Sequence, residues 1–238
     1  MDGHTSPFGT SGASTPLQRS GASSNQIHAL KSEVIDGIEE IMDEISQVDD
    51  QVGALAEVQI HPGDHILVHQ PSRTVERFIL RAALRRKFTV FIATQPPPRV
   101  KKSGEDLYAS FRKRLSAAGI SAINITCGGV MAYMSRVDKV IMGASAITAG
   151  GGVVSDAGAA AIARAAKEQG TAVIVLAGIY KLSPSNPFRD DQVIEWANPM
   201  KYVSFADGDL VNANGCLVKT ALSEFIPGKL IDTYVTNL

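Results

Sequence analysis

The sequence predicts an α/β protein whose main part is a Rossmann-like, doubly wound parallel sheet preceded by an amphipathic helix. Two observations carry this prediction. From residue 64 onward, short apolar runs alternate with segments of helical periodicity, which is the order of a βαβ protein. The apolar runs are also nearly continuous, which is typical of parallel strands buried on both faces. Right-handed crossovers between such strands place helices on both faces of one sheet.

The elements follow one another at short intervals. The first strand, His65–His69, precedes a helix from Arg73 with Val75, Phe78 and Ile79 on its inward face. Later elements repeat this arrangement, and an alanine-rich helix among them has small residues that allow close packing against the sheet. The expected strands span residues 65–69, 88–94, 121–126, 139–143 and 171–177, and the expected helices span residues 73–87, 103–118, 129–135 and 155–169.

The chain divides by composition into three parts. Residues 1–26 are rich in Ser, Gly, Thr and Pro and have little to bury, so we expect them to be disordered. Residues 27–57 carry apolar residues at spacings of three and four, backed by acidic residues, which predicts an amphipathic helix. Residues 58–238 form the expected Rossmann-like domain. Because the chain stops directly after an apolar run, we expect the final segment of that domain to be missing.

Charge and composition argue against several classes of protein. The 23 Lys and Arg residues nearly balance the 24 Asp and Glu residues, so a dedicated nucleic-acid binder is not expected. Basic runs at residues 85–87 and 112–114 lie on expected helices, where we interpret them as solvated faces. We find neither a signal peptide nor a membrane-spanning run, and the two cysteines occur in no CxxC pattern. We therefore expect a protein of the cytosol that contacts no membrane.

Three loops could form a ligand site, because ligands of an open parallel sheet bind beyond the carboxyl ends of its strands. These loops span residues 69–73, 126–129 and 143–152. The glycine triplet at residues 150–152 could present backbone N–H groups to an anion at the start of the helix expected near Ser155. The triplet matches neither a dinucleotide fingerprint nor a P-loop, and a tight turn explains it equally well. We therefore expect no bound cofactor.

The histidines and cysteines predict neither a metal site nor a nucleophile. His61, His65 and His69 recur every four residues, but Pro62-Gly63 breaks any helix that would align them. Cys127 lies in a glycine-rich turn with no histidine close to it in the sequence. We therefore interpret Cys127 as a small buried thiol.

Three segments carry a resemblance to a known family. They are Ser72-Arg73-Thr74-Val75-Glu76, the run of residues 134–143 (MSRVDKVIMG), and Tyr180-Lys181-Leu182-Ser183-Pro184. In this order they resemble the alpha, beta and delta regulatory subunits of translation initiation factor 2B, the guanine nucleotide exchange factor for initiation factor 2. The Lys-Leu-Ser-Pro run favours the beta branch of this family over the alpha and delta branches. The similarity covers roughly residues 60–238.

The resemblance implies a regulatory role without catalysis. In this family the alpha, beta and delta subunits share a helical N-terminal region and a Rossmann-like domain, and they form a hexameric core. That core carries the gamma and epsilon subunits, of which epsilon holds the exchange activity. The core also binds the alpha subunit of initiation factor 2 and senses its phosphorylation. We therefore expect these proteins as partners, and the helix at residues 27–57 as a remnant of the helical region.

The same domain resembles aldose–ketose isomerases of methylthioribose 1-phosphate and ribose 1,5-bisphosphate, which gives an alternative function. Such an enzyme moves a proton between neighbouring carbons and needs a positioned acid and base. Where the isomerases have a cysteine after the first strand this chain has Gln70, and where they have an aspartate it has Gly152. An Asn-Lys pair becomes Ser155-Asp156, which places a negative charge where a sugar phosphate would be held. These replacements predict that the chemistry is lost.

A pocket inherited from such an enzyme could still bind a ligand for sensing. The residues that would line it are Gln70, Ser72, Arg73, Gly150, Gly151, Gly152 and Ser155. Loops filled by the protein's own side chains are the competing interpretation. For contacts with other subunits we nominate Arg73, Arg136 and Lys181, which lie at the ends of elements, although each could instead form an ion pair within the domain.

Overall fold

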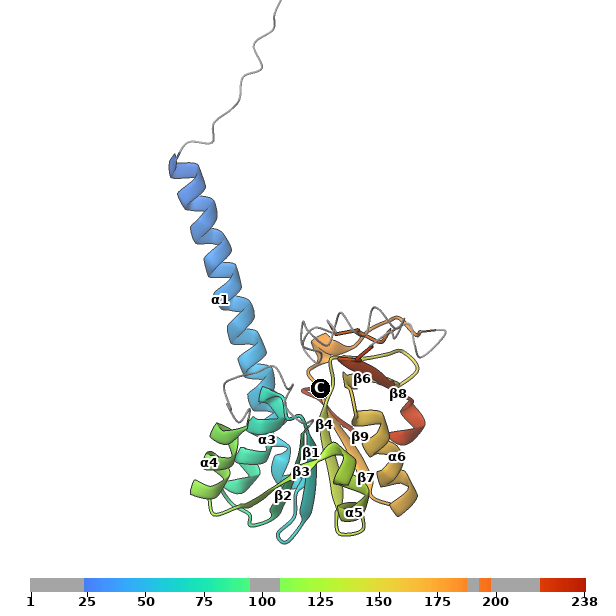
Figure 1. The fold of residues 1–238 in the computed structure, drawn as a ribbon. Coiled ribbons are helices and arrows are strands. Elements are labelled where there is room, and N and C mark those ends of the chain that lie inside the picture. Colours follow the sequence, from blue (N-terminus) through green and yellow to red (C-terminus); the bar gives the residue numbers. More distant parts are fainter. Residues whose placement is uncertain (1–23, 95–107, 188–192, 198–218) are drawn as a thin grey trace, which may run out of the picture. The chain divides into compact units, whose positions relative to one another are not determined.

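The computed structural model in Figure 1 describes residues 24–94, 108–187, 193–197 and 219–238. The chain forms two compact units, Met1–Asp43 and Glu44–Leu238. The expected amphipathic helix is present as α1 (Ser24–Ala54), which begins in the first unit and ends in the second. The segment expected to be disordered lies outside the described residues, apart from residues 24–26 at the start of α1. No helix in the described part of the chain is both long enough and apolar enough to cross a membrane.

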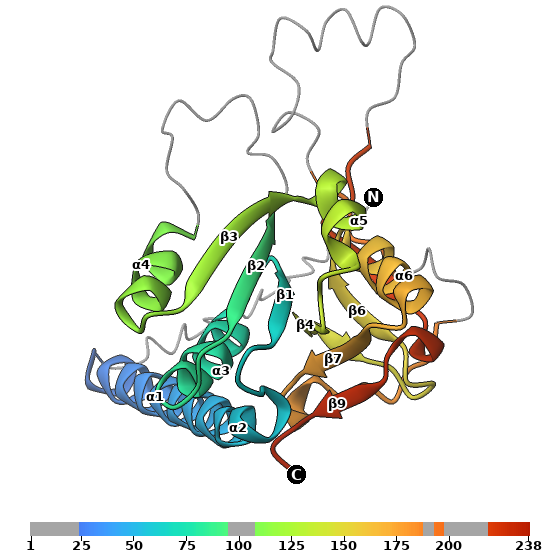
Figure 2. The same cartoon turned by 90° about the horizontal axis from the view of Figure 1, so that it is seen from below.

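The second unit is built on a six-stranded parallel sheet in the order β3-β2-β1-β4-β7-β9, seen in Figure 2. The strands are β1 (His65–His69), β2 (Thr89–Thr94), β3 (Ser121–Thr126), β4 (Lys139–Gly143), β7 (Ala172–Leu176) and β9 (Thr233–Val235). The first five agree with the predicted strands to within one residue at each end. The three-residue β9 was not predicted, because so short a strand at the sheet edge carries too few residues to show a pattern.

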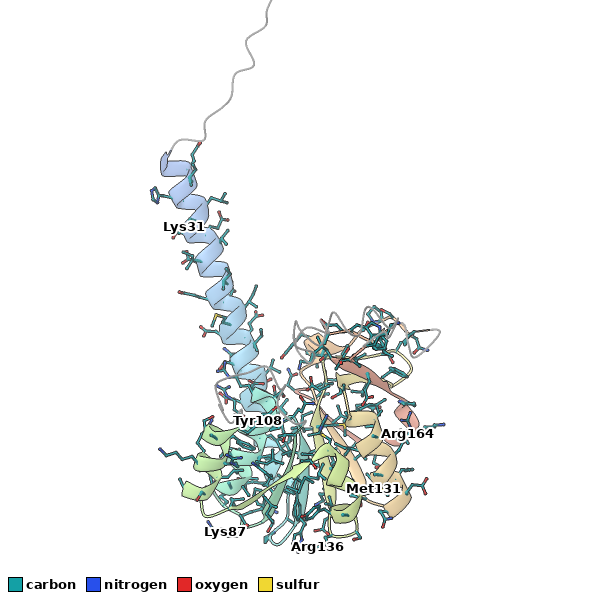
Figure 3. All side chains as sticks on the ribbon, viewed as in Figure 1. Lys31, Lys87, Tyr108, Met131, Arg136 and Arg164 are labelled. Carbon is teal, nitrogen blue, oxygen red and sulfur yellow. The ribbon has the colours of Figure 1, made fainter. Side chains whose placement is uncertain are left out.

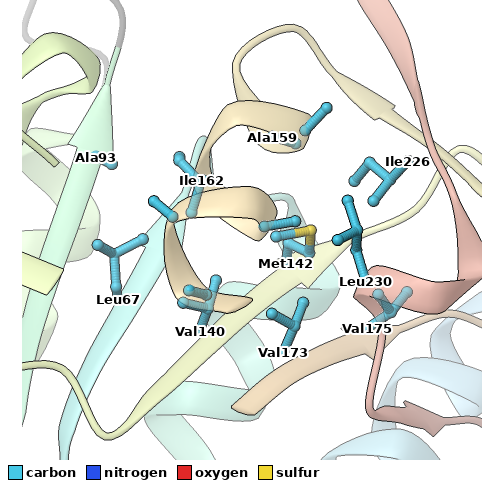
Figure 4. Packing of buried hydrophobic residues seen from close by; sticks show 14 of the residues in the cluster. Leu67, Ala93, Val140, Met142, Ala159, Ile162, Val173, Val175, Ile226 and Leu230 are labelled. Atoms are coloured by element: carbon cyan, nitrogen blue, oxygen red, sulfur yellow. The ribbon is translucent and has the colours of Figure 1, made fainter. Parts of the chain in front are cut away.

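Helices cover both faces of this sheet, so the predicted doubly wound architecture is confirmed (Figure 2). On one face lie α2 (Ala56–Gln59), α3 (Arg73–Ala83) and α4 (Ala109–Ala117), and on the other lie α5 (Val130–Met134) and α6 (Ala159–Gln169). Each face has its own hydrophobic cluster. Figure 4 shows Ile162 of α6 near Leu67 and Val140 of the sheet. Five of the six alanines of α6, all except Ala161, are buried, which confirms the close packing expected from their small size.

A second, antiparallel sheet corrects one prediction. It contains β5 (Ala146–Ile147), β6 (Val153–Asp156) and β8 (Ser223–Ile226). Ser155 therefore lies in strand β6, and the prediction of a helix beginning there was wrong. The strand forms because Ser155 pairs with Glu224, a non-local contact that the local sequence pattern cannot reveal. Gly158, with φ at 102°, then turns the chain into α6.

The remaining helices agree with expectation except at their ends. The 3₁₀ turns among the described residues are η1 (Cys127–Gly129), η2 (Ile179–Lys181) and η5 (Gly228–Leu230). Helix α3 ends at Ala83 rather than near residue 87, and Arg86 Nη1 instead donates a hydrogen bond to the carbonyl oxygen of Ile60. The expected start of the next helix, at residues 103–107, lies outside the described residues.

The last turns of α1 are fixed to the domain by a buried carboxylate and a buried valine. Asp49 is 4% exposed and accepts a hydrogen bond of 2.7 Å from Thr74 Oγ1. Arg77 Nη1 lies 3.6 Å from the other oxygen of the Asp49 carboxylate. A buried charge is tolerated only when it is paired in this way, so the two partners define one position for this part of the helix. Val52, one turn later, is completely buried.

Replacing Val52 with Ala should lower the free energy of unfolding by about 2 kcal/mol, because a fully buried side chain loses two methyl groups and leaves a cavity. Val34→Ala, in the same helix at 53% exposure, is the matched control and should change stability by less than about 0.5 kcal/mol. Urea unfolding followed by near-ultraviolet circular dichroism measures both. Equal effects from the two variants would contradict the packing of the last turns of α1.

Candidate functional site at the carboxyl edge of the sheet

The candidate site lies where the order of the strands reverses direction. The sequence order runs outward from β1 to β2 and β3 on one side, and from β4 to β7 and β9 on the other. In such sheets the crevice beyond the carboxyl ends of the two central strands is the usual ligand site. Gln70 follows β1, Ala144 follows β4, and Cys127 follows β3 at the same edge. All three of the predicted loops therefore begin at one edge of the sheet.

His69 is the buried histidine of this edge, at 2% exposure. Its Nε2 lies 3.1 Å from the carbonyl oxygen of Ala157, and a carbonyl can only accept, so Nε2 carries the hydrogen. Burial lowers the pKa of His69, and the hydrogen bond to Ala157 and the negative charge of Asp156 oppose this shift. The imidazole is therefore neutral at pH 7, with Nδ1 free to accept a hydrogen bond.

Cys127 occupies the acceptor side of this imidazole. Its Sγ lies 3.7 Å from His69 Nδ1, within the longer reach of a sulfur hydrogen bond, so the thiol donates to the ring. Burial raises the pKa of the Cys127 thiol, which favours the neutral form. This neighbour could not be predicted from local spacing, because the two residues are 58 positions apart. The pair is a neutral thiol and a neutral imidazole, and not a thiolate–imidazolium nucleophile.

Gln70 has an unusual backbone conformation. Among the described residues it is the one non-glycine with positive φ, at 38°. Such a backbone persists only when its surroundings hold it, and here the side-chain Nε2 donates to the carbonyl oxygen of Ala157 at 3.2 Å. The carbonyl of Ala157 thus contacts both His69 and Gln70. The amide of Gln70 does not ionise near neutral pH, so it can position a group but cannot act as a general acid.

Ser72 and Ser155 meet at Gly143. The hydroxyl of Ser155 donates to the carbonyl oxygen of Gly143 at 2.8 Å. A side chain at Gly143 would come 2.9 Å from Ser72 Oγ, so glycine is needed for the close approach of the two loops. Ser72 Oγ is buried and has no hydrogen-bond partner among the described residues. Gln70, Ser72 and Ser155 of the predicted pocket therefore do lie at the switch point.

Side chains of the protein itself occupy the space beside the glycine triplet. A Cβ placed on Gly152 would lie 2.1 Å from Cζ of Phe225, so the phenyl ring occupies the space of any side chain there. The hydroxyl of Tyr234 donates to the carbonyl oxygen of Gly151, and the backbone of Gly151 packs against Gly228. The triplet leads into strand β6 and not into a helix, so it is not a phosphate cradle.

The N-terminus of α6 is also occupied by the protein itself. Oε1 of Glu224 accepts hydrogen bonds of 2.7 Å from the backbone N–H groups of both Gly158 and Ala160. These are the unsatisfied donors at which a helix usually attracts an anion. The carboxylate therefore takes the position that a phosphate would need. Neither Glu224 nor Phe225 was recognised in the sequence, because only the pairing of β8 with β6 brings them here.

Burial shifts the pKa values of several ionisable groups around the crevice in the direction that favours their neutral forms. Partial burial raises the pKa of Asp156, and attraction to His69 and Lys181 opposes the shift. Burial raises the pKa of Tyr108 to about 12, with help from the negative charges of Asp156 and other acidic groups. In the part of the chain that the structure describes, no three His, Cys, Asp or Glu side chains gather into a metal site.

The three residues nominated for contacts with other subunits lie apart. Arg73 is exposed at the start of α3, on the carboxyl edge. Arg136 is exposed just before β4, on the opposite edge, and Figure 3 shows it at the lower end of the domain. Lys181 is half-buried, and its Nζ donates to the carbonyl oxygen of Ala144 at 2.6 Å, while burial lowers its pKa. Lys181 is therefore engaged within the domain, through a backbone carbonyl rather than an ion pair.

Comparisons with known proteins agree on one family. The model described as the Initiation factor 2 subunit family matches residues 13–238. Translation initiation factor eIF2B subunit beta of Schizosaccharomyces pombe is 36% identical over 209 residues, which are 88% of this chain and 51% of that protein. The chain thus spans about half the length of this curated relative. Ribose 1,5-bisphosphate isomerase of Pyrococcus furiosus is 28% identical over 215 residues, covering 90% of this chain and 64% of the enzyme.

Two solved structures are similar in both fold and sequence. The crystal structure of eIF2B beta from Chaetomium thermophilum matches with a TM-score of 0.65 and 45% identity, covering 89% of this chain and 55% of that one. A chain of the tetrameric eIF2B-beta2-delta2 complex from C. thermophilum matches with a TM-score of 0.66 and 44% identity, covering 89% of this chain and 62% of that one.

The buried neutral His69 predicts a loss of stability in acid. Its pKa in the folded protein is lowered, so between that value and the unfolded value of about 6.5 the unfolded chain binds more protons. Its contribution is therefore complete above about pH 6.5 and is lost as the pH falls through the folded pKa. The free energy of unfolding should decline below pH 6.5, and His69→Gln should flatten that part of the profile. An unchanged slope in the variant would assign the effect to other groups.

The contact between Gly152 and Phe225 predicts a compensating pair of substitutions. Gly152→Ala should destabilise the protein by roughly 1–3 kcal/mol because its Cβ would overlap the phenyl ring. Adding Phe225→Leu removes the ring atoms at Cζ and should recover part of that loss, which a double-mutant cycle measures. Gly128→Ala, where a Cβ would meet nothing within 4 Å, is the control. If the losses of unfolding free energy caused by Gly152→Ala and Phe225→Leu simply add, the phenyl ring does not occupy the space beside Gly152.

Proposed function

The chain belongs to the Initiation factor 2 subunit family, and on that premise we propose that it is a non-catalytic regulatory subunit of the guanine nucleotide exchange factor for translation initiation factor 2. Membership confirms the resemblance carried by its three segments, and the similarity to eIF2B beta subunits agrees with the beta branch that Lys181-Leu182-Ser183-Pro184 favours. The proposed role is to contribute to assembly of the complex and to sensing phosphorylated initiation factor 2. Its proposed location is the cytosol.

The observation that carries this proposal is the filled carboxyl edge. An isomerase needs an open crevice with a proton donor and acceptor beside the substrate. Here Phe225 occupies the space beside Gly152, where the isomerases have a carboxylate, and Glu224 occupies the N-terminus of α6. Gln70 takes the place of the cysteine and is bonded to the backbone of Ala157. This packing supports a scaffold that acts by binding other proteins at its surface and does not bind a substrate in its crevice.

The partners follow from the family and its assembled members. A complex of two beta and two delta chains exists for the C. thermophilum proteins, so a delta-type subunit is the first proposed partner. The alpha, gamma and epsilon subunits and the alpha subunit of initiation factor 2 complete the proposed set. We assign residues 27–57 to the helical region of the family and residues 58–238 to its Rossmann-like domain. Within the carboxyl edge, Gln70, Ser72, Gly151, Gly152 and Ser155 would pack the domain instead of holding a ligand, and Arg73 and Gly150 are exposed beside them.

The proposed mechanism is a change in the population of conformations. Regulatory domains that contact initiation factor 2 can stabilise one pose of it when it is unmodified and another when it is phosphorylated. Phosphorylation can shift the populations of the two poses only if it changes the difference in their binding free energies. This chain would then alter access of the substrate to the catalytic subunit without touching guanine nucleotide.

The alternative function, an aldose–ketose isomerase, rests on the similarity to the P. furiosus enzyme and on the Cys127–His69 pair. In that reading the thiol and the imidazole would take the roles of acid and base. Their neutral forms and the occupied crevice argue against it. Incubating the purified chain with ribose 1,5-bisphosphate or methylthioribose 1-phosphate should give no product above the uncatalysed rate, and turnover that Cys127→Ser abolishes would establish the enzyme.

Coexpression with a delta-type subunit tests the regulatory role. The tagged chain should copurify with that subunit, and mass measurement of the native complex should give a hetero-oligomer. Arg73 and Arg136 lie on opposite edges of the sheet, so Arg73→Glu and Arg136→Glu form a matched pair of charge reversals. If the carboxyl edge is the interface, Arg73→Glu should weaken the complex about tenfold or more while Arg136→Glu leaves it intact. A chain that remains alone in every coexpression would remove the proposal's support.

A further inference from the structure

The N-terminal part of α1 presents an exposed apolar face. Its large side chains recur at spacings of three and four, which places them along one side of the helix. They are Ile27, Leu30, Val34, Ile38, Ile41 and Ile45, with exposed fractions of 57%, 62%, 53%, 51%, 57% and 40%. Ile35 and Met42, also exposed, widen the same side. We call these eight residues the open face of α1.

The open face continues a stripe that is already used for packing. At the same helical spacing, the next apolar residues are Val48, which is half-buried, and Val52, which is fully buried. Within the compact unit this end of the stripe packs against the core of the domain. The residues before it have the same chemistry and are 40–62% exposed. A helix with so wide an apolar side normally buries it against another element.

The open face is bordered by acidic residues, whose charge limits which partners could bind there. Glu33 and Glu44 lie along one border by helical position, and Glu39 lies along the other. Asp36, Glu40 and Asp43 complete an acidic back, and none of these six carboxylates forms an ion pair within the described ranges. Lys31, labelled in Figure 3, is the one Lys or Arg between residues 27 and 45.

This charge pattern disfavours two occupants. A second copy of α1 would bring its own acidic borders beside those of the first, and like charges across a helix pair are destabilising. A membrane surface attracts helices whose polar side is rich in Lys and Arg, and the polar side of α1 has the opposite sign. A basic helix meets neither objection, because its flanking cations would face the glutamates.

We propose that the open face of α1 docks an amphipathic helix of a partner protein whose apolar stripe is bordered by Lys and Arg. The apolar contact supplies the affinity and the charged borders supply the selectivity. This surface lies outside the carboxyl edge of the sheet, and the inference does not depend on the regulatory role proposed above.

Binding to designed helices tests this proposal on the full chain. Two synthetic peptides, each about four heptads long, carry the same leucine stripe, bordered by Lys in one and by Glu in the other. Titration by fluorescence anisotropy should show saturable binding of the Lys peptide and at least about tenfold weaker binding of the Glu peptide. The affinity for the Lys peptide should fall as salt is raised.

Variants of α1 locate the binding surface. The double variant Ile38→Ala and Ile41→Ala keeps the helix, because alanine has the highest helix propensity, but should weaken binding of the Lys peptide about tenfold or more. Ser32→Ala, on the polar side, is the control and should leave binding unchanged. The combined variant Glu33→Lys, Glu39→Lys and Glu44→Lys should reverse the preference toward the Glu peptide.

Three results would overturn the proposal. Equal binding of the two peptides would show that charge does not select the occupant. Absence of binding to either peptide would show that the open face does not accept a helix. Self-association of the chain in sedimentation, lost in the Ile38→Ala and Ile41→Ala double variant, would identify a second copy as the occupant instead.

Discussion

The antiparallel pairing of β6 with β8 is the constraint on which the carboxyl edge depends. It joins Val153–Asp156, just after the glycine triplet, to Ser223–Ile226 near the end of the described chain. Side chains alternate along β8, so neighbouring residues serve different places: Phe225 fills the space at Gly152, while Glu224 reaches the N-terminus of α6. One short strand thus supplies both groups that occupy the crevice, and a slip of one residue would remove both.

The parallel sheet could be predicted from the sequence, and the contents of its carboxyl edge could not. Strands such as Ala172–Leu176 are buried over almost their whole length. A continuous run of apolar residues predicts this burial on both faces of the sheet. The position of the edge follows from topology alone. Its occupants come from β8, and the sequence around Glu224 has no pattern that ties it to α6. The same holds for Cys127, whose histidine neighbour comes from another strand.

Ser155 shows why the local pattern failed where it did. Val153 and Val154 are β-branched, and the alanines that follow favour a helix, so the change from strand to helix had to fall somewhere between them. Only Gly158, whose φ of 102° suits no other residue well, fixes that change at the observed place. The local sequence could not decide between the two interpretations of the glycine triplet, because the triplet has the composition of an anion loop but leads into a strand.

The carboxylate at the N-terminus of α6 belongs to the same chain as the helix, and this has a consequence for how the site can respond. A tethered group is present at a fixed effective concentration, which does not change with the amount of any solute in the cell. A dissolved phosphate compound would have to displace Glu224 from two backbone N–H groups before it could bind there. A phosphate compound could therefore bind at the N-terminus of α6 only at a concentration high enough to displace this tethered carboxylate.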